Sequence, residues 1–182
     1  MLRRLMEILF IVIVLAIGAA MGAARLWPKP GEGFWWRAAE LARMPKDIGA
    51  VDLTTLQRRV THNDALICPE SKCTKAKADV VAPIFPVPVA ELRRKLDIVV
   101  HSEPRSAELT CGANCDRIGR YVEYSALFQF PDIIDVEVVE AGANASTLAI
   151  YSRSVFGYWD FDVNRERAAR WVAALQRIIP KS

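Results

Sequence analysis

The amino-acid sequence predicts an α+β domain: a small antiparallel sheet of about four strands, with helices packed on one face and one N-terminal transmembrane helix before it. Three observations support this prediction. A long apolar run lies near the N-terminus, the second half contains segments that alternate as strands do, and the last segment has helical apolar spacing. The 182 residues, 52% hydrophobic and 25% charged, suit one globular domain with an appendage.

The apolar run extends from Leu5 to Ala24 and is interrupted only by Glu7. Twenty helical residues rise about 30 Å, which matches the hydrocarbon core of a bilayer. A cleaved signal peptide is the alternative, because Gly18-Ala-Ala20 and Gly22-Ala-Ala24 offer the small residues that signal peptidase requires. The run is longer than the ~7–15 residues of a signal core. We therefore expect residues 1–24 to form an uncleaved anchor.

Residues 25–50 are expected to connect the anchor to the domain. Prolines and glycines break regular structure there, and three tryptophans are typical of a membrane interface: Pro28, Pro30, Gly31, Gly33, Trp27, Trp35 and Trp36. The basic residues Arg3 and Arg4 before the anchor favour a cytoplasmic N-terminus only slightly, since Arg25 and Lys29 follow it.

Four cysteines form two local pairs, Cys68 with Cys73 and Cys111 with Cys115. In a chain exported across a membrane, such pairs predict two disulfide-closed loops. A zinc site of four thiolates and a redox centre are the alternatives, although neither pair has Cys-x2-Cys spacing. The disulfide interpretation places the domain in the periplasm, attached by a single pass to the inner membrane.

The globular domain is expected over residues 51–182. We predict an irregular, disulfide-closed loop from Asn63 to Cys73, followed by a helix from Val89 to Val99. Four strand candidates come next: Ala107–Cys111, Arg120–Phe128, Ile133–Val139 and Ser146–Ser154. The last helix is predicted from Asn164 to Ile179, with an apolar stripe that contains Trp171.

Polar side chains gather where the last strand meets the last helix, namely Arg153, Asp160, Asp162, Asn164, Arg165 and Arg167. A helix N-terminus and several arginines favour an anionic ligand, and the two aspartates could act as acid and base. The alternative is structural. Asp162 or Asn164 would cap the helix, Gly157 would adopt a positive φ, and Arg153 would pair with Asp160. Asp135 and Glu137, on one face of the neighbouring strand, would join these arginines in a buried ionic network.

The junction and four earlier motifs resemble the domain-of-unknown-function 1499 family. The motifs are Asn63-Asp-Ala-Leu-Ile-Cys68, Ala78-Asp79, Pro131-Asp132, Asp135-Val-Glu137 and the block from Ser152 through Gly157, Asp160, Asn164, Arg165 and Arg167. Members of the family usually have glycine where this chain has Asp162. The resemblance, from about Asn63 to Leu175, implies a small domain, often tethered to a membrane, whose activity is unknown.

The sequence contains no complete catalytic constellation, and it suggests neither a cofactor nor a metal site. His62 and His101 have no partners at metal-ligand spacing and are expected at the surface. A net charge of +3, interspersed along the chain, does not favour nucleic acid as a partner. The leading prediction is a non-catalytic binding or accessory module of the cell envelope. The membrane holds it through the N-terminal helix, and its partner is expected to be an envelope protein, a membrane complex or a lipid headgroup. The alternative is an envelope hydrolase or transferase with an Asp/Arg site at the junction.

Overall fold

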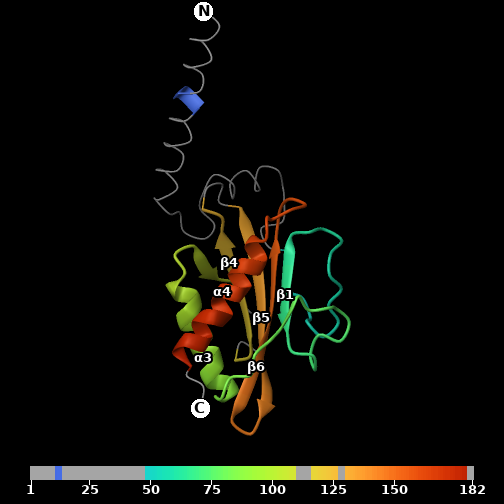
Figure 1. Ribbon diagram of the computed structural model, residues 1–182, viewed down its shortest axis with the longest axis vertical. Coiled ribbons are helices and arrows are strands. Elements are labelled where there is room, and N and C mark those ends of the chain that lie inside the picture. The colour runs from blue at the N-terminus through green and yellow to red at the C-terminus, as the bar shows by residue number, and fades with distance from the viewer. Residues whose placement is uncertain (1–10, 14–47, 110–115, 127–129, 180–182) are drawn as a thin grey trace, which may run out of the picture.

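The computed structural model describes residues 11–13, 48–109, 116–126 and 130–179. It has an α+β fold in which two helices lie on one face of a six-stranded sheet (Figure 1). The strand order is β2-β1-β6-β5-β4-β3. The elements are β1 Asp64–Cys68, β2 Val80–Val81, α3 Val89–Ser102, β3 Ser106–Glu108, β4 Ile118–Tyr124, β5 Pro131–Gly142, β6 Ala145–Ser154 and α4 Val163–Ile178.

The predicted α+β class is confirmed, but the predicted four-stranded antiparallel sheet is wrong. The four expected strands are β3 to β6, and they pair antiparallel. Strand β1 adds to β6, and β2 pairs with β1 in parallel, so the sheet is mixed. The predicted irregular loop from Asn63 to Cys73 is wrong where β1 lies. Both faces of β1 are covered, so Ala65 to Cys68 are all buried and do not alternate in polarity as the residues of a half-buried strand do.

The two faces of the sheet have different coverings. On β5, Ile134, Val136 and Val138 face the helices and join Trp171 and Leu175 of α4 in the main core. The opposite face is covered beside β1 by Leu53 and Leu56, which pack against a cluster of β1 and β6 residues: Leu66, Cys68, Ala149 and Tyr151. Side chains of neighbouring residues on a strand therefore enter different environments.

Two glycines allow local arrangements that a side chain would disturb. Gly157, in the turn after β6, has φ +88°, as the sequence suggested. Its carbonyl accepts a 2.6 Å hydrogen bond from the Asn63 side-chain amide. At Gly119 on β4, an added Cβ would lie 2.5 Å from the Tyr121 hydroxyl, so this position excludes larger residues.

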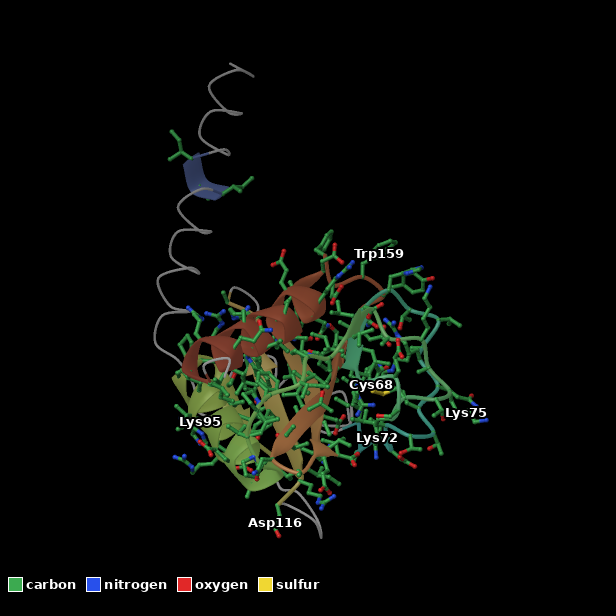
Figure 2. The ribbon with its side chains drawn as sticks, turned by 60° about the horizontal axis from the view of Figure 1, so that its bottom comes forward. Cys68, Lys72, Lys75, Lys95, Asp116 and Trp159 are labelled. Carbon is green, nitrogen blue, oxygen red and sulfur yellow. A yellow bond between two sulfur atoms is a disulfide. The ribbon has the colours of Figure 1, made fainter. Side chains whose placement is uncertain are left out.

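The disulfide between Cys68 and Cys73 is present, with the two Cα atoms 6.1 Å apart, and this pairing is confirmed. It connects the end of β1 to the loop beside it (Figure 2). The other predicted pair, Cys111 and Cys115, lies outside the described residues.

The predicted anchor, except for residues 11–13, also lies outside the described residues, as does the connector up to residue 47. Residues 11–13 are helical and exposed. Among the described residues, no helix has both the length and the apolar character that crossing a bilayer requires.

One end of the sheet brings together the start of β1, the start of β5 and the end of β6. The register pairs Asp64 with Arg153 and Asp132 with Ser154. Ile48, where the described domain begins, packs at the same end against a cluster that contains Tyr124. The β5–β6 hairpin turn lies at the other end of the strands, so we call the first end the junction end.

Candidate functional site

The eight candidate residues at the junction do not form one site, because the sheet divides them. Three of them lie on the sheet face away from the helices, two lie on the buried face beneath α4, and three lie at the junction end, where they line a pocket. The group on the face away from the helices is Arg153, Asp135 and Glu137. The group beneath α4 is Asn164 and Arg167, and the group that lines the pocket is Asp160, Asp162 and Arg165.

On the face away from the helices, Arg153 pairs with Asp135 rather than with Asp160. Its Nη2 lies 3.0 Å from Asp135 Oδ2, and Arg120 Nε lies 3.0 Å from Asp135 Oδ1. All three residues are buried. Arg153 also donates to the Gly49 carbonyl at 2.5 Å, and its guanidinium lies 5.4 Å from the centre of the Tyr151 ring. Burial lowers the pKa of Arg153, while the charge of Asp135 acts in the opposite direction.

Glu137 lies two residues further along β5 but is not part of this arginine network. Its carboxylate pairs with Lys72 at 2.6 Å, on the loop closed by the disulfide. The pair joins that loop to the sheet and is only partly buried.

Beneath α4, Arg167 is held by two buried carboxylates. Its Nη2 lies 2.6 Å from Asp132, and its Nε lies 3.1 Å from Glu123. Burial raises the pKa of Asp132, against the lowering effect of Arg167. Arg167 is 1% exposed, so this side chain cannot reach a ligand in solvent.

Asn164 is completely buried and joins α4 to β6 and to Asn63, the residue before β1. Its amide nitrogen donates to the Asn63 carbonyl at 3.1 Å, to Ser154 Oγ at 2.9 Å and to Asp160 Oδ2 at 2.7 Å. Its amide oxygen accepts from Ser152 and from Arg167, both at 2.6 Å. This side chain uses its hydrogen-bonding capacity within the fold.

Asp160, and not Asp162 or Asn164, supplies the side-chain cap of α4. Its carboxylate accepts from the backbone N–H of Asn164 at 3.0 Å and from that of Asp162 at 3.2 Å. The N-terminus of the helix therefore already holds a negative charge, which argues against the expected anion site at this position.

Asp162 has φ +64°, in the left-handed region, and its side chain makes no capping hydrogen bond. Glycine adopts this conformation without a steric cost. The backbone at this position therefore favours a glycine.

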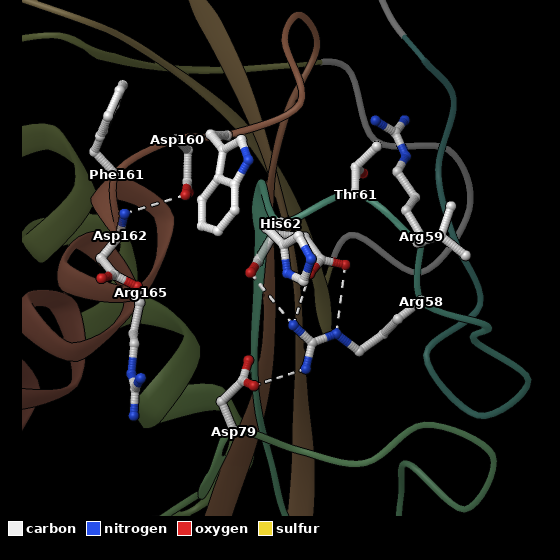
Figure 3. Close-up of a pocket in the computed structure, with 12 residues that line it drawn as sticks. Arg58, Arg59, Thr61, His62, Asp79, Asp160, Phe161, Asp162 and Arg165 are labelled. Atoms are coloured by element: carbon white, nitrogen blue, oxygen red, sulfur yellow. Dashed lines mark hydrogen bonds and ion pairs between the residues drawn. The ribbon is translucent and has the colours of Figure 1, made fainter.

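A pocket of about 820 Å³ opens at the junction end (Figure 3). One wall is the turn into α4, with Trp159, Asp160, Phe161, Asp162 and Arg165, and the other is the segment before β1. The second wall is formed by Arg58, Arg59, Val60, Thr61, His62 and Asp64, together with Asp79. The His62 ring stacks on Trp159 with ring centres 4.7 Å apart, so the two walls are in contact.

Arg58 is a fixed part of the second wall. It lies 2.6 Å from Asp64 and 2.7 Å from Asp79, and Asp64 also accepts a 2.6 Å hydrogen bond from the Tyr151 hydroxyl. Burial acts to lower the pKa of Arg58, but the hydrogen bonds to the two aspartates raise it overall. Both carboxylates are therefore held by a structural partner.

Sequence reasoning missed the wall formed by residues 58–62. No recognisable motif marks it, although Asp64 and Asp79 both lie in the motifs that carried the family resemblance. Arg58 contacts these two aspartates across 6 and 21 positions of sequence, and no local spacing indicates such a contact. The exposed His62, expected at the surface without a role, also lines the pocket.

A second pocket of about 490 Å³ adjoins the first and shares Arg58, Asp79 and Arg165 with it. Lys75 and Lys77 add two more cations. The side chain of Arg165 has no hydrogen bond or ion pair among the described residues, and it points away from the helix cap (Figure 3). The same part of the chain contains no group of three or more metal-ligating side chains.

Comparison with known proteins gives one match. The family profile described as "Protein of unknown function (DUF1499)" matches residues 120–175, from β4 to α4. No curated protein and no solved structure matches the chain. The matched segment contains all eight candidate residues and leaves out the wall of residues 58–62. Over residues 120–175, the resemblance to this family of unknown function is therefore confirmed.

Proposed function

We propose that this chain is a membrane-anchored, non-catalytic binding module, and that the pocket at the junction end is its binding site. The predicted helix of residues 1–24 is the anchor, and the domain lies on the periplasmic side of the inner membrane. The Cys68–Cys73 disulfide supports this compartment, because structural disulfides persist in oxidising environments.

The observation that carries the proposal is the division of charged groups at the junction. Asp160 caps α4, and Asp64 and Asp79 hold Arg58, so three of the four carboxylates in the pocket already have structural partners. Arg165 lines both pockets and is exposed. A site with occupied carboxylates and an available guanidinium is better suited to holding a ligand than to proton transfer.

An envelope hydrolase or transferase is the second candidate, because Asp162 and Arg165 line the same pocket. Asp162 would serve as acid or base and Arg165 as the substrate clamp. Arg153 has no place in this candidate, since it lies buried against Asp135. The candidate requires a second titratable group near Asp162, and His62 is the one available in the opposite wall.

Two measurements on the full-length chain in its native membrane test the leading proposal. After a carbonate wash, the protein should remain in the membrane pellet. A photoreactive benzoylphenylalanine at position 161, beside the pocket, should form adducts on irradiation, whereas the same residue at position 143, on the far hairpin turn, should not. A washed-out protein contradicts the anchor, and an absence of adducts at position 161 contradicts the binding site.

A further inference from the structure

The junction end carries a set of exposed apolar side chains. We call this set the apolar rim: Val60, Tyr158, Trp159, Phe161 and Val163, with exposed fractions of 89%, 54%, 63%, 88% and 39%. All five belong to the two chain segments that form the walls of the first pocket. Such a gathering of large apolar residues on one end of a small domain marks an interaction surface.

The place where the chain enters the domain indicates which surface the apolar rim faces. Ile48 packs against the same cluster as Val155, which directly follows β6, and the predicted connector and anchor precede Ile48. The Gly49 carbonyl is also held there by Arg153. The chain that leads to the predicted anchor therefore enters the domain at the same end as the rim. Figure 2 shows Trp159 at this end and Asp116 at the opposite one.

The chemistry of the rim fits a phospholipid surface. Aromatic side chains are favoured at the level of lipid headgroups, where an apolar ring and a polar edge both find suitable surroundings. Arg59 and Arg165 are exposed and line the pocket beside the rim, where guanidinium groups can bind lipid phosphates. Phe161 is exposed and has a positive φ of 55°, a conformation that is costly for a bulky residue in the absence of a compensating contact.

We propose that the junction end rests on the bilayer that holds the predicted anchor, with Val60, Trp159 and Phe161 in the interface and Arg59 and Arg165 at the lipid phosphates. This inference rests on the proposed function and names its ligand as the phospholipid surface. The pocket then opens toward the membrane, and its ligand is a lipid headgroup.

Fluorescence quenching in lipid nanodiscs tests the orientation. The full-length chain is placed in phosphatidylcholine nanodiscs with and without bromine on the acyl chains, which quenches only tryptophans that reach the bilayer. Three proteins are compared: wild type, Trp159→Phe, and Trp159→Phe combined with Ala143→Trp. The last protein moves the indole to the exposed hairpin turn at the opposite end of the sheet. Because Trp159 and Ala143 are exposed, both changes should preserve the fold.

The proposal predicts that wild type loses more fluorescence to brominated lipid than Trp159→Phe does, and that Ala143→Trp adds no further loss. Equal losses in wild type and Trp159→Phe, or a new loss from the indole at position 143, would overturn it. These outcomes are independent of the carbonate wash. A protein that remains in the membrane pellet but shows no quenching of Trp159 retains its anchor and refutes only the orientation.

Discussion

The guanidinium of Arg153 and the carboxylate of Asp135 lie 3.0 Å apart across β6 and β5, both buried, on the sheet face away from the helices. Arg120 approaches the same carboxylate from the other side. A buried carboxylate is stable only with such partners. The residue that the sequence presented as a possible ligand clamp therefore serves the fold, and the pocket lies on the exposed side of the same junction.

The cap of α4 gives the first prediction. Asp160→Ala removes the acceptor of the Asn164 backbone N–H and of its side-chain amide. We expect the free energy of unfolding to fall by about 1–2 kcal/mol, measured by urea unfolding of residues 48–182. Asp160→Asn retains a side-chain oxygen, so its free energy of unfolding should fall by less. Equal losses in the two variants would contradict the capping role.

The left-handed backbone of Asp162 gives the second prediction. Asp162→Gly should raise the free energy of unfolding by about 0.5–1 kcal/mol, because glycine adopts φ +64° without steric cost. Asp162→Ala is the matched control, since it removes the carboxylate but keeps the Cβ, and it should not stabilise the domain. Equal stabilisation by both variants would assign the effect to charge instead of backbone conformation.

Two buried tyrosines give a prediction at alkaline pH. Burial raises the pKa values of Tyr121 and Tyr151, and a hydrogen bond to Asp64 adds to the effect on Tyr151. Above pH of about 10 the unfolded chain loses these protons while the folded domain keeps them. Stability should therefore fall as the pH rises, by about 1.4 kcal/mol per pH unit for each tyrosine.

Tyr151→Phe should remove one of these two contributions. Urea unfolding between pH 9 and 11 should then show a shallower loss of stability than in wild type. The variant also leaves Asp64 without its hydroxyl partner. The loss of this hydrogen bond lowers stability at neutral pH, but it is not the cause of the shallower dependence on pH. An unchanged slope would show that Tyr151 ionises equally in the folded and unfolded states.

The cysteines give the fourth prediction. Peptide mass spectrometry of the unreduced protein should identify linkages between Cys68 and Cys73 and between Cys111 and Cys115, of which the second is a prediction from the sequence alone. Replacing Cys73 by alanine opens a short loop and should cost about 2 kcal/mol. Four alkylatable thiols, or one bound zinc per chain, would contradict both the pairing and the compartment.

The sequence predicted the parts of the fold that show periodicity. Strand β5 alternates because Ile134 and Val136 enter the main core while Asp135 faces the other side. The helix α4 shows its buried stripe in the same way. Strand β1 has no such signal, since Leu66 and Ile67 are buried on opposite faces in two different clusters.

The candidate site was only partly predictable, for a similar reason. Proximity in sequence placed Arg153, Arg165 and Arg167 together, but β6 and α4 direct their side chains into three different environments. Partners such as Asp135 for Arg153 depend on strand pairing. The wall that contains Arg58 and His62 arises from contacts with Asp64 and Trp159 that form only in the folded chain.

The central claim is that the junction is divided between a buried ionic network and an exposed binding pocket. Urea unfolding of Arg153→Ala and Arg165→Ala, side by side, tests it most directly. We predict that Arg153→Ala costs about 1–3 kcal/mol, because Asp135 and the Gly49 carbonyl lose a buried hydrogen-bond donor while Arg120 still holds Asp135. We predict that Arg165→Ala stays within about 0.5 kcal/mol of wild type. An Arg153→Ala domain as stable as wild type, or an Arg165→Ala domain that loses as much stability as Arg153→Ala, would contradict the division.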